Sequence, residues 1–163
     1  MNTAMTRRFG RAAPGERVIE QVPRNYGAQT SMISALGLRG LVATMTLEGA
    51  VDTLAFNTYL NEVLAAKLQR GDVVILDNLN VHKASQIEQV ATRRGAQVIW
   101  LAPYSPDYSP IEPCWSKIKQ ALRAAKARTR EELEAALVRA MNLVSNSDIR
   151  GWFNHCGYPV ASG

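Results

Sequence analysis

The chain has 163 residues, of which 47% are hydrophobic and 20% are charged, and its formal net charge is +5. These values are typical of one globular domain with a hydrophobic core, and they exclude collagen-like, wholly disordered and disulfide-scaffold classes. The two cysteines, Cys114 and Cys156, lack a paired metal-binding spacing, and we interpret both as free thiols. The sequence has no apolar run of about 18 residues and no apolar stretch of the signal-peptide type, so we expect a cytoplasmic protein.

The positive charge is concentrated in two segments. Residues 1–24 contain five arginines against two glutamates, and residues 113–130 contain six lysines and arginines and no acidic residue. Such clusters neutralise phosphates and predict nucleic-acid binding, although a solvated helix face and an irregular arm would have the same composition. The candidate DNA-contacting residues are Arg7, Arg8, Arg11, Lys117, Lys119, Arg123, Lys126 and Arg128.

In chain order, residues 1–17 come first, and Gly10, Pro14 and Gly15 predict an irregular arm there. Residues 30–38 and 41–47 are rich in strand-forming residues and predict a hairpin that turns at Arg39-Gly40. Asp52 or Thr53 can then cap a helix that runs to about Gln69, with Gly71 beyond its end.

Residues 73–76 form a short apolar run that is typical of a strand buried on both faces. The elements predicted after it are a helix over about 83–94, a strand over 97–101, a proline-rich loop over 102–109, a helix over about 110–127, a helix from 129 or 130 to about 144, and a small Trp152/Phe153 cluster. This order predicts a mixed α/β fold, with βαβ units in its second half.

Asp77 directly follows the predicted strand 73–76. Ligands of α/β sheets bind beyond the carboxyl ends of strands, and a carboxylate there would have water on one side only. Asp77 is therefore a candidate ligand of a hard cation such as Mg²⁺, whereas the alternative is a turn cap. His82, five residues later, could point to the same site or could be a cap or surface residue.

Glu112 is the second candidate carboxylate. Pro103, Pro106 and Pro110 stiffen the segment before it. Ser109 is a plausible N-cap three residues earlier, so Glu112 could belong to a capping box, or its carboxylate could face a metal from a rigid helix start. Farther along the same helix, Trp115 falls on an apolar stripe with Ile118 and Leu122, and we interpret it as a core residue.

Two motifs here resemble those of the DDE transposases of bacterial insertion sequences related to mariner elements. The first is Ile75-Leu-Asp77-Asn-x-x-x-His82, and the second runs from Leu101 through Pro-Tyr-Ser-Pro-Asp-Tyr and Pro-Ile-Glu112 to Lys119. Between Asp77 and Glu112 lie 34 residues, the spacing of that family's second and third acids. The resemblance covers about residues 3–145.

The resemblance implies a ribonuclease-H-like mixed sheet flanked by helices over residues 25–163, behind an arm of residues 1–24, with C-terminal helices from about residue 129. It implies Mg²⁺- or Mn²⁺-dependent cleavage at transposon ends and strand transfer to target DNA, with two ions in the complete enzyme. Asp77 and Glu112 would be its catalytic, metal-binding acids, and Asn78 and His82 would be accessory residues. The implied partners are transposon-end and target DNA, and a second copy of the chain or an upstream portion of the transposase, in the bacterial nucleoid.

That family's first acid lies on a first strand, upstream of the segment that resembles Met5–Gly15. We therefore expect this chain to lack that strand, its acid and the helix-turn-helix region before them. The first strand of the fold is central, so its loss would expose two sheet edges. The chain would then be a catalytic portion that acts with an N-terminal portion, or a remnant that binds DNA without cutting it. A resolvase-type nuclease on the same fold is a third hypothesis.

Overall fold

The computed structural model describes residues 1–25, 27, 29–77 and 81–160, except for the side chains of residues 81–84. It begins with strands β1 (Thr30–Gly37) and β2 (Gly40–Glu48), helix α1 (Thr53–Thr58) and a π-helical continuation, η1 (Tyr59–Leu64). Strand β3 (Val73–Leu76), helix α2 (Val81–Arg94) and strand β4 (Gln97–Trp100) follow. A 3₁₀ turn, η2 (Pro106–Tyr108), precedes α3 (Ile111–Ala125), α4 (Arg130–Asn142) and α5 (Asn146–His155).

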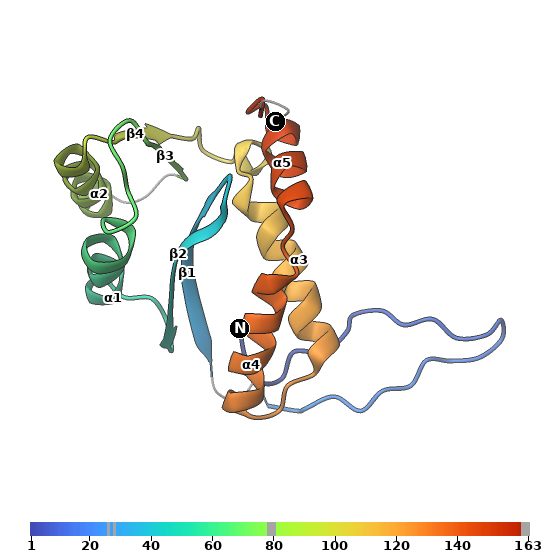
Figure 1. Cartoon of the computed structure of the whole chain (residues 1–163). Helices are drawn as coiled ribbons and strands as arrows, with labels where there is room; N and C mark the ends of the chain where they lie inside the picture. Colours follow the sequence, from blue (N-terminus) through green and yellow to red (C-terminus); the bar gives the residue numbers. More distant parts are fainter. Residues whose placement is uncertain (26, 28, 78–80, 161–163) are drawn as a thin grey trace.

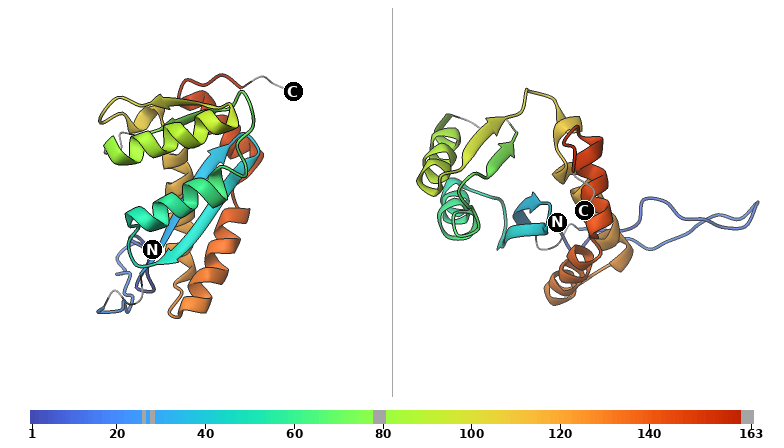
Figure 2. Two further views of the ribbon diagram at one scale, coloured as in Figure 1. Left: turned by 90° about the vertical axis from the view of Figure 1, so that its left-hand side faces the viewer. Right: turned by 45° about the horizontal axis from the view of Figure 1, so that its top comes forward.

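Strands β1 and β2 form the predicted antiparallel hairpin, which lies at the centre of the molecule (Figures 1 and 2). The turn exposes Leu38 and Arg39, and Gly40 has a φ of +119°, a conformation that favours glycine. The hydroxyls of Ser34 and Thr44 lie 2.7 Å apart across the strand pair. The sequence prediction of this hairpin is therefore confirmed.

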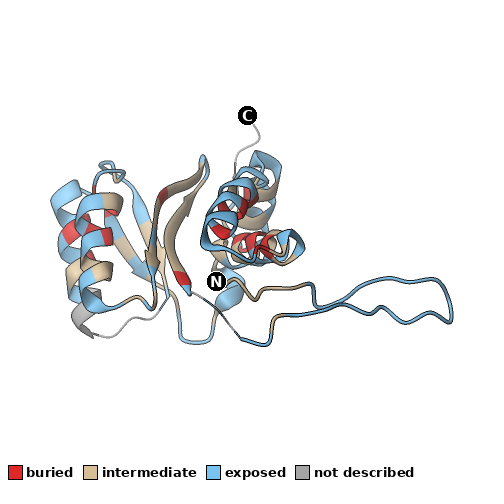
Figure 3. Cartoon of the chain, turned by 90° about the horizontal axis from the view of Figure 1, so that it is seen from below, coloured by how far each residue is buried: buried red, intermediate tan, exposed pale blue. Residues whose placement is uncertain are grey.

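The hairpin separates two hydrophobic clusters, because successive side chains of a strand point to opposite faces. Met32 and Leu36 of β1 pack against the first cluster, which lies on α3 and α4 and comprises Cys114, Ile118, Leu122, Ala127, Leu133, Ala136, Leu137 and Ala140. Ile33 and Ala35 pack against the second cluster, whose buried residues are Ala43, Tyr59, Leu60, Leu64, Ala65, Ile87 and Val90. Figure 3 shows these buried residues on both sides of the hairpin.

Strands β3 and β4 are parallel and pair Ile75 with Ile99, but they form a sheet of their own. The four described strands therefore belong to two small sheets rather than one mixed sheet. One face of the β3–β4 sheet packs against the second cluster through Val74, Leu76 and Trp100. On the other face Val73 is 48% exposed and Ile99 49% exposed. The prediction that strand 73–76 is buried on both faces is wrong, because helices cover only one face.

The first two residues belong to a strand pairing rather than to an irregular arm. The amino group of Met1 donates a hydrogen bond to the carbonyl of Thr30 at 2.7 Å, and the Thr30 N–H donates to the Met1 carbonyl at 2.8 Å. Asn2 forms an antiparallel bridge with Gln29. Because backbone groups alternate in direction along a strand, Met1 occupies the edge of β1 opposite β2.

Residues 7–24, here called the N-terminal loop, extend away from the rest of the chain (Figure 1). They are almost entirely exposed and contain no helix or strand. At the tip the Glu16 N–H donates to the Ala13 carbonyl at 3.0 Å, and Gly15 has a φ of +87°. At the base, Glu20 forms an ion pair with Lys126, which connects the loop to the end of α3.

The helices differ from their predicted bounds in two places. The helix predicted from Asp52 to about Gln69 ends as a π-helical turn at Leu64, although Asp52 does cap it by accepting a hydrogen bond from Ala55 N–H at 2.7 Å. Helix α5 covers the segment for which only the Trp152/Phe153 cluster was predicted. Its cap is Ser145, and the Lys117 Nζ to Asp148 Oδ2 ion pair of 2.5 Å connects it to α3.

Both cysteines are buried and unpaired, which confirms their interpretation as free thiols. Burial raises the pKa of the Cys114 thiol to about 11, so the thiol stays protonated at neutral pH. No helix of the described chain is long and apolar enough to cross a membrane.

The ion pair between Lys117 and Asp148 predicts an acid-sensitive contribution to stability. The hydrogen bonds from Lys117 and from the Ser145 hydroxyl lower the pKa of Asp148 from 3.8 to about 2. A carboxyl group whose pKa is lower in the folded than in the unfolded chain stabilises the fold at a pH above its unfolded-state pKa. This stabilisation is lost as the pH falls through the folded-state pKa. We expect Asp148→Asn to lower stability at pH 7 and to weaken its pH dependence between about pH 4 and pH 2. Urea unfolding at several pH values measures this.

The matched control for that experiment is Glu62→Gln, which removes an exposed carboxylate from η1. It should leave the slope between pH 4 and pH 2 as in the unmodified chain. An Asp148→Asn variant that keeps the full acid dependence would contradict the role given to this ion pair.

Candidate functional site

Asp77 lies directly after β3, at the carboxyl edge of the β3–β4 sheet. The N–H of Leu101 donates to the Leu76 carbonyl at 2.9 Å, so the two strands stay paired up to the point where Asp77 leaves the sheet. The position is the one predicted for a ligand of an α/β sheet. Its surroundings differ from the prediction, because Asp77 is exposed rather than solvated on one side only. The uncovered outer face of β3–β4 explains the difference.

Glu112 lies in the first turn of α3, and its side chain is exposed. The helix begins after Pro110, which has helical φ and ψ and makes no side-chain cap. The prediction that Ser109 is the N-cap is therefore wrong, and Glu112 is in no capping box. Instead the Glu112 N–H donates to the Ser109 carbonyl at 3.1 Å. The carboxylate of Glu112 is thus exposed to solvent at the N-terminal end of α3.

The apolar stripe of α3 determines where Glu112 faces. Cys114 and Ile118 are buried in the first cluster, and Trp115 is partly buried against it, as predicted for a core residue. Because these residues anchor one side of the helix, its first turn is held in one orientation. Glu112 remains outside the cluster, so its direction is determined by packing that does not involve its own side chain.

A residue far along the chain also holds the segment before Glu112. The Tyr158 hydroxyl donates a hydrogen bond to the Tyr108 carbonyl at 2.8 Å. The Tyr158 ring meets the Phe153 ring edge to face, with the two ring centroids 6.1 Å apart. The end of α5 therefore lies beside η2 and the start of α3 (Figure 1). Sequence reasoning missed Tyr158, and no local pattern could have indicated a contact across fifty residues.

The metal site expected at Asp77 and Glu112 stays a prediction. In the described part of the chain, no three His, Cys, Asp or Glu side chains are close enough together to hold a metal ion. Asp77 and Glu112 offer the carboxylate oxygens that Mg²⁺ prefers, and both are accessible. The predicted accessory residue Asn78 lies outside the described residues. His82 is in the first turn of α2, but its side chain also lies outside what the structure describes.

Several of the predicted DNA-contacting cations are already engaged within the chain. Lys117 pairs with Asp148, Lys126 pairs with Glu20, and Arg128 donates to the carbonyls of Thr3 and Met5. By contrast, the described residues give Lys119 and Arg123 no ion pair with an acidic side chain. Arg7, Arg8 and Arg11 are exposed on the N-terminal loop. Lys119 and Arg123 are therefore the cations of α3 that can contact a phosphate without losing a partner.

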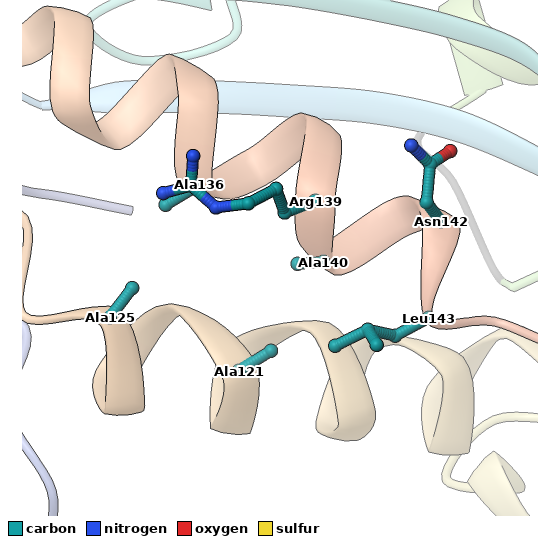
Figure 4. Close-up of a pocket in the computed structure, with 7 residues that line it drawn as sticks. All are labelled: Ala121, Ala125, Ala136, Arg139, Ala140, Asn142 and Leu143. Carbon is teal, nitrogen blue, oxygen red and sulfur yellow. The ribbon is translucent and has the colours of Figure 1, made fainter.

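An open cavity of about 470 Å³ between α3 and α4 is separate from these residues. Figure 4 shows the Leu143 side chain pointing from the end of α4 toward α3. The lining contains one ionisable group and no carboxylate, thiol or imidazole, so it offers no metal ligands and no acid–base pair. Its residues are Ala121, Ala125, Ala136, Arg139, Ala140, Asn142 and Leu143.

Comparison with known proteins gives one finding for this chain. A family model described as "DDE superfamily endonuclease" matches residues 1–134, which include both candidate carboxylates and end within α4. Helix α5 and Tyr158 lie beyond the matched region. No curated protein sequence matches the chain.

Two Ser/Thr-x-x-Glu motifs of the chain, at Ser109 and at Thr129, predict different mutational effects. Thr129 accepts a hydrogen bond from the Glu132 N–H at 3.2 Å and forms a full capping box at α4, whereas Ser109 caps nothing. We expect Thr129→Ala to lower the unfolding free energy by about 1 kcal/mol. Ser109→Ala should change it by less than about 0.5 kcal/mol. Urea denaturation of both variants measures this, and equal losses would show that Ser109 does cap α3.

Proposed function

This chain belongs to the DDE superfamily of endonucleases, and we propose that it is the catalytic domain of a transposase that cuts DNA at transposon ends and joins them to target DNA. The observation that carries the proposal is the placement of two accessible carboxylates on rigid elements. Asp77 directly follows the β3 strand, and Glu112 lies in the first turn of the α3 helix. Rigid placement matters because a metal-dependent phosphodiester reaction needs its ligands preorganised.

Asp77 and Glu112 would hold Mg²⁺, and their residue type fits that ion because carboxylate oxygens are its preferred protein ligands. When bound, two such ions activate the attacking oxygen and stabilise the leaving oxygen of a phosphodiester. The chain's own contribution is to orient the two carboxylates and to bind the phosphates beside them. Lys119 lies seven residues after Glu112 on the same helix, so a strand that reaches Glu112 can continue along α3.

Within this proposal, the family's first acid would come from a strand that pairs with β1 along its edge opposite β2, beyond the pairing of Met1 with Thr30. Two described features support that position. Met1 already pairs with Thr30 in the antiparallel sense on that edge, and β1 and β3 are not paired with each other. A strand between them would join the two small sheets into one ribonuclease-H-like sheet, with an acid at its end near Asp77.

The second candidate function is DNA binding without cleavage by a remnant of a transposase. Its supporting observation is that the described residues contain two of the expected acids but no cluster of three metal-ligating side chains. Purified chain, supercoiled DNA and Mg²⁺ discriminate the two functions. Nicking by this chain would exclude the non-catalytic remnant. The enzyme would be excluded if this chain, and also the product of the whole genomic reading frame, bound DNA without nicking it.

Removing either carboxylate should stop cleavage but not DNA binding. We expect Glu112→Gln and Asp77→Asn each to lower the nicking rate by more than about 100-fold, because the loss of one metal ligand removes several kcal/mol of transition-state stabilisation. DNA affinity should stay within about twofold, since neither carboxylate attracts phosphate. Asp107→Asn, which removes an exposed acid from η2, is the matched control and should cut normally. Equal losses of binding and cleavage would show that the carboxylate is structural.

Lys119 and Arg123 have no ion-pair partner among the residues that the structure describes, and neutralising them should weaken DNA binding in a salt-dependent way. For Lys119→Gln and Arg123→Gln we expect the slope of log K against log salt to fall by about one unit for each DNA phosphate that the variant no longer neutralises. Lys67→Gln, an exposed lysine after η1, serves as the control and should leave the slope unchanged. An unchanged slope in the two α3 variants would remove this helix face from the DNA path.

A further inference from the structure

Tyr104, in the segment between β4 and α3, has the most exposed large hydrophobic side chain among the described residues, with a relative exposure of 101%. Its ring therefore contacts almost nothing in its own protein. The segment crosses from the β3–β4 sheet to the start of α3 (Figure 1). Tyr108, four residues later, is 58% exposed. A polar loop residue would cost less to place in water than either aromatic ring.

The backbone of Tyr104 is strained as well. Its φ is +60°, and among the described residues only Lys126 shares a positive φ without being glycine. Lys126 has an ordinary reason, because it terminates α3 in the left-handed conformation that often ends helices. Tyr104 terminates no helix, and glycine or asparagine would adopt this conformation more easily. Tyr104 follows Pro103 in a turn, and a residue other than glycine that is kept in this left-handed conformation is a candidate for a functional role.

The surroundings hold Tyr104 in place. Pro103 and Pro106 restrict the backbone on both sides, and the Ser105 carbonyl accepts a hydrogen bond from the Tyr108 N–H at 3.2 Å. Tyr158 fixes the far end through the Tyr108 carbonyl. The exposed ring is thus presented on a stiff support, and little entropy would be lost when a ligand stacks on it.

The location of Tyr104 connects it with the candidate site. Three residues before it, Leu101 is hydrogen bonded to Leu76, the residue that precedes Asp77. Eight residues after it comes Glu112. Tyr104 therefore lies on the chain segment that connects the strand beside Asp77 with the helix that carries Glu112.

We propose that Tyr104 stacks on an unpaired base of the substrate DNA beside the cleaved phosphate. This inference rests on the proposed function, because it assumes a DNA substrate at Asp77 and Glu112. Base–aromatic stacking suits an exposed ring, and it tolerates any sequence because every base has a π-face. A base that has left the duplex also frees its phosphate to approach the carboxylates.

Equilibrium binding without metal tests the proposal, since it requires no cleavage. The probe is duplex DNA with a short single-stranded 3′ overhang that carries 2-aminopurine, a base whose fluorescence falls on stacking. Tyr104→Ala should weaken binding about 5- to 100-fold and abolish the fluorescence change. Tyr104→Phe, which keeps the ring, should bind within about twofold of the unmodified chain. On blunt duplex DNA the three proteins should bind equally.

Two controls separate stacking from a structural role. Tyr104→Gly suits the positive φ, so it should raise the melting temperature or leave it unchanged while binding as weakly as Tyr104→Ala. A lower melting temperature would show that Tyr104 supports the fold and would overturn the proposal. Leu54→Ala removes a 75% exposed side chain from α1 and should have no effect on binding.

The remaining outcomes are distinct. If the unmodified chain binds no DNA, both the proposed function and the proposed stacking are wrong. If it binds and Tyr104→Ala binds equally well, only the stacking fails. If Tyr104→Phe lost as much DNA affinity as Tyr104→Ala, the contact would belong to the hydroxyl group. If Tyr104→Ala lost self-association instead of DNA binding, the contact would belong to a second copy of the chain. Both results overturn the proposal.

Discussion

The alternation of side chains along the β1–β2 hairpin holds the two halves of the molecule in position. Met32 and Leu36 face the cluster on α3 and α4, whereas Ile33 and Ala35 face the cluster that supports β3. Asp77 belongs to the second half and Glu112 to the first. The relative placement of the two carboxylates therefore depends on the register of a hairpin that contains neither, and a slip of one residue would exchange its faces and dismantle both halves.

The electrostatics of the candidate site follow from its exposure. Asp77 and Glu112 are both exposed to water, so their positions do not incur the desolvation cost of a buried carboxylate pair. The positive charges are arranged differently, since Lys117 and Lys126 already have acidic partners. A large part of the net charge in segment 113–130 therefore stabilises the fold, and the surface available to a polyanion is narrower than the composition indicates.

Local signals predicted most elements, and contacts distant in sequence decided the rest. The hairpin, β3, β4 and α3 lie within a few residues of their predicted bounds, because alternation and apolar stripes are short-range patterns. Ser109 had the correct capping spacing, but Pro110 adopts helical angles without a side-chain cap, which the motif alone does not reveal. Helix α5 has few apolar residues and is held by Lys117, a residue of another helix. For the site, the positions of both acids were predictable from strand and helix ends. The exposure of Asp77 was not, because it depended on which face of the β3–β4 sheet is covered.

Lys126 serves two parts of the molecule at once. It ends α3 in the left-handed conformation, and its ammonium group pairs with Glu20 at the base of the N-terminal loop. One ammonium group cannot closely neutralise two anions in different places, so an anion that approaches this end of α3 competes with Glu20. By thermodynamic linkage, the position of the N-terminal loop and the affinity of this helix end for anions must each respond to the other.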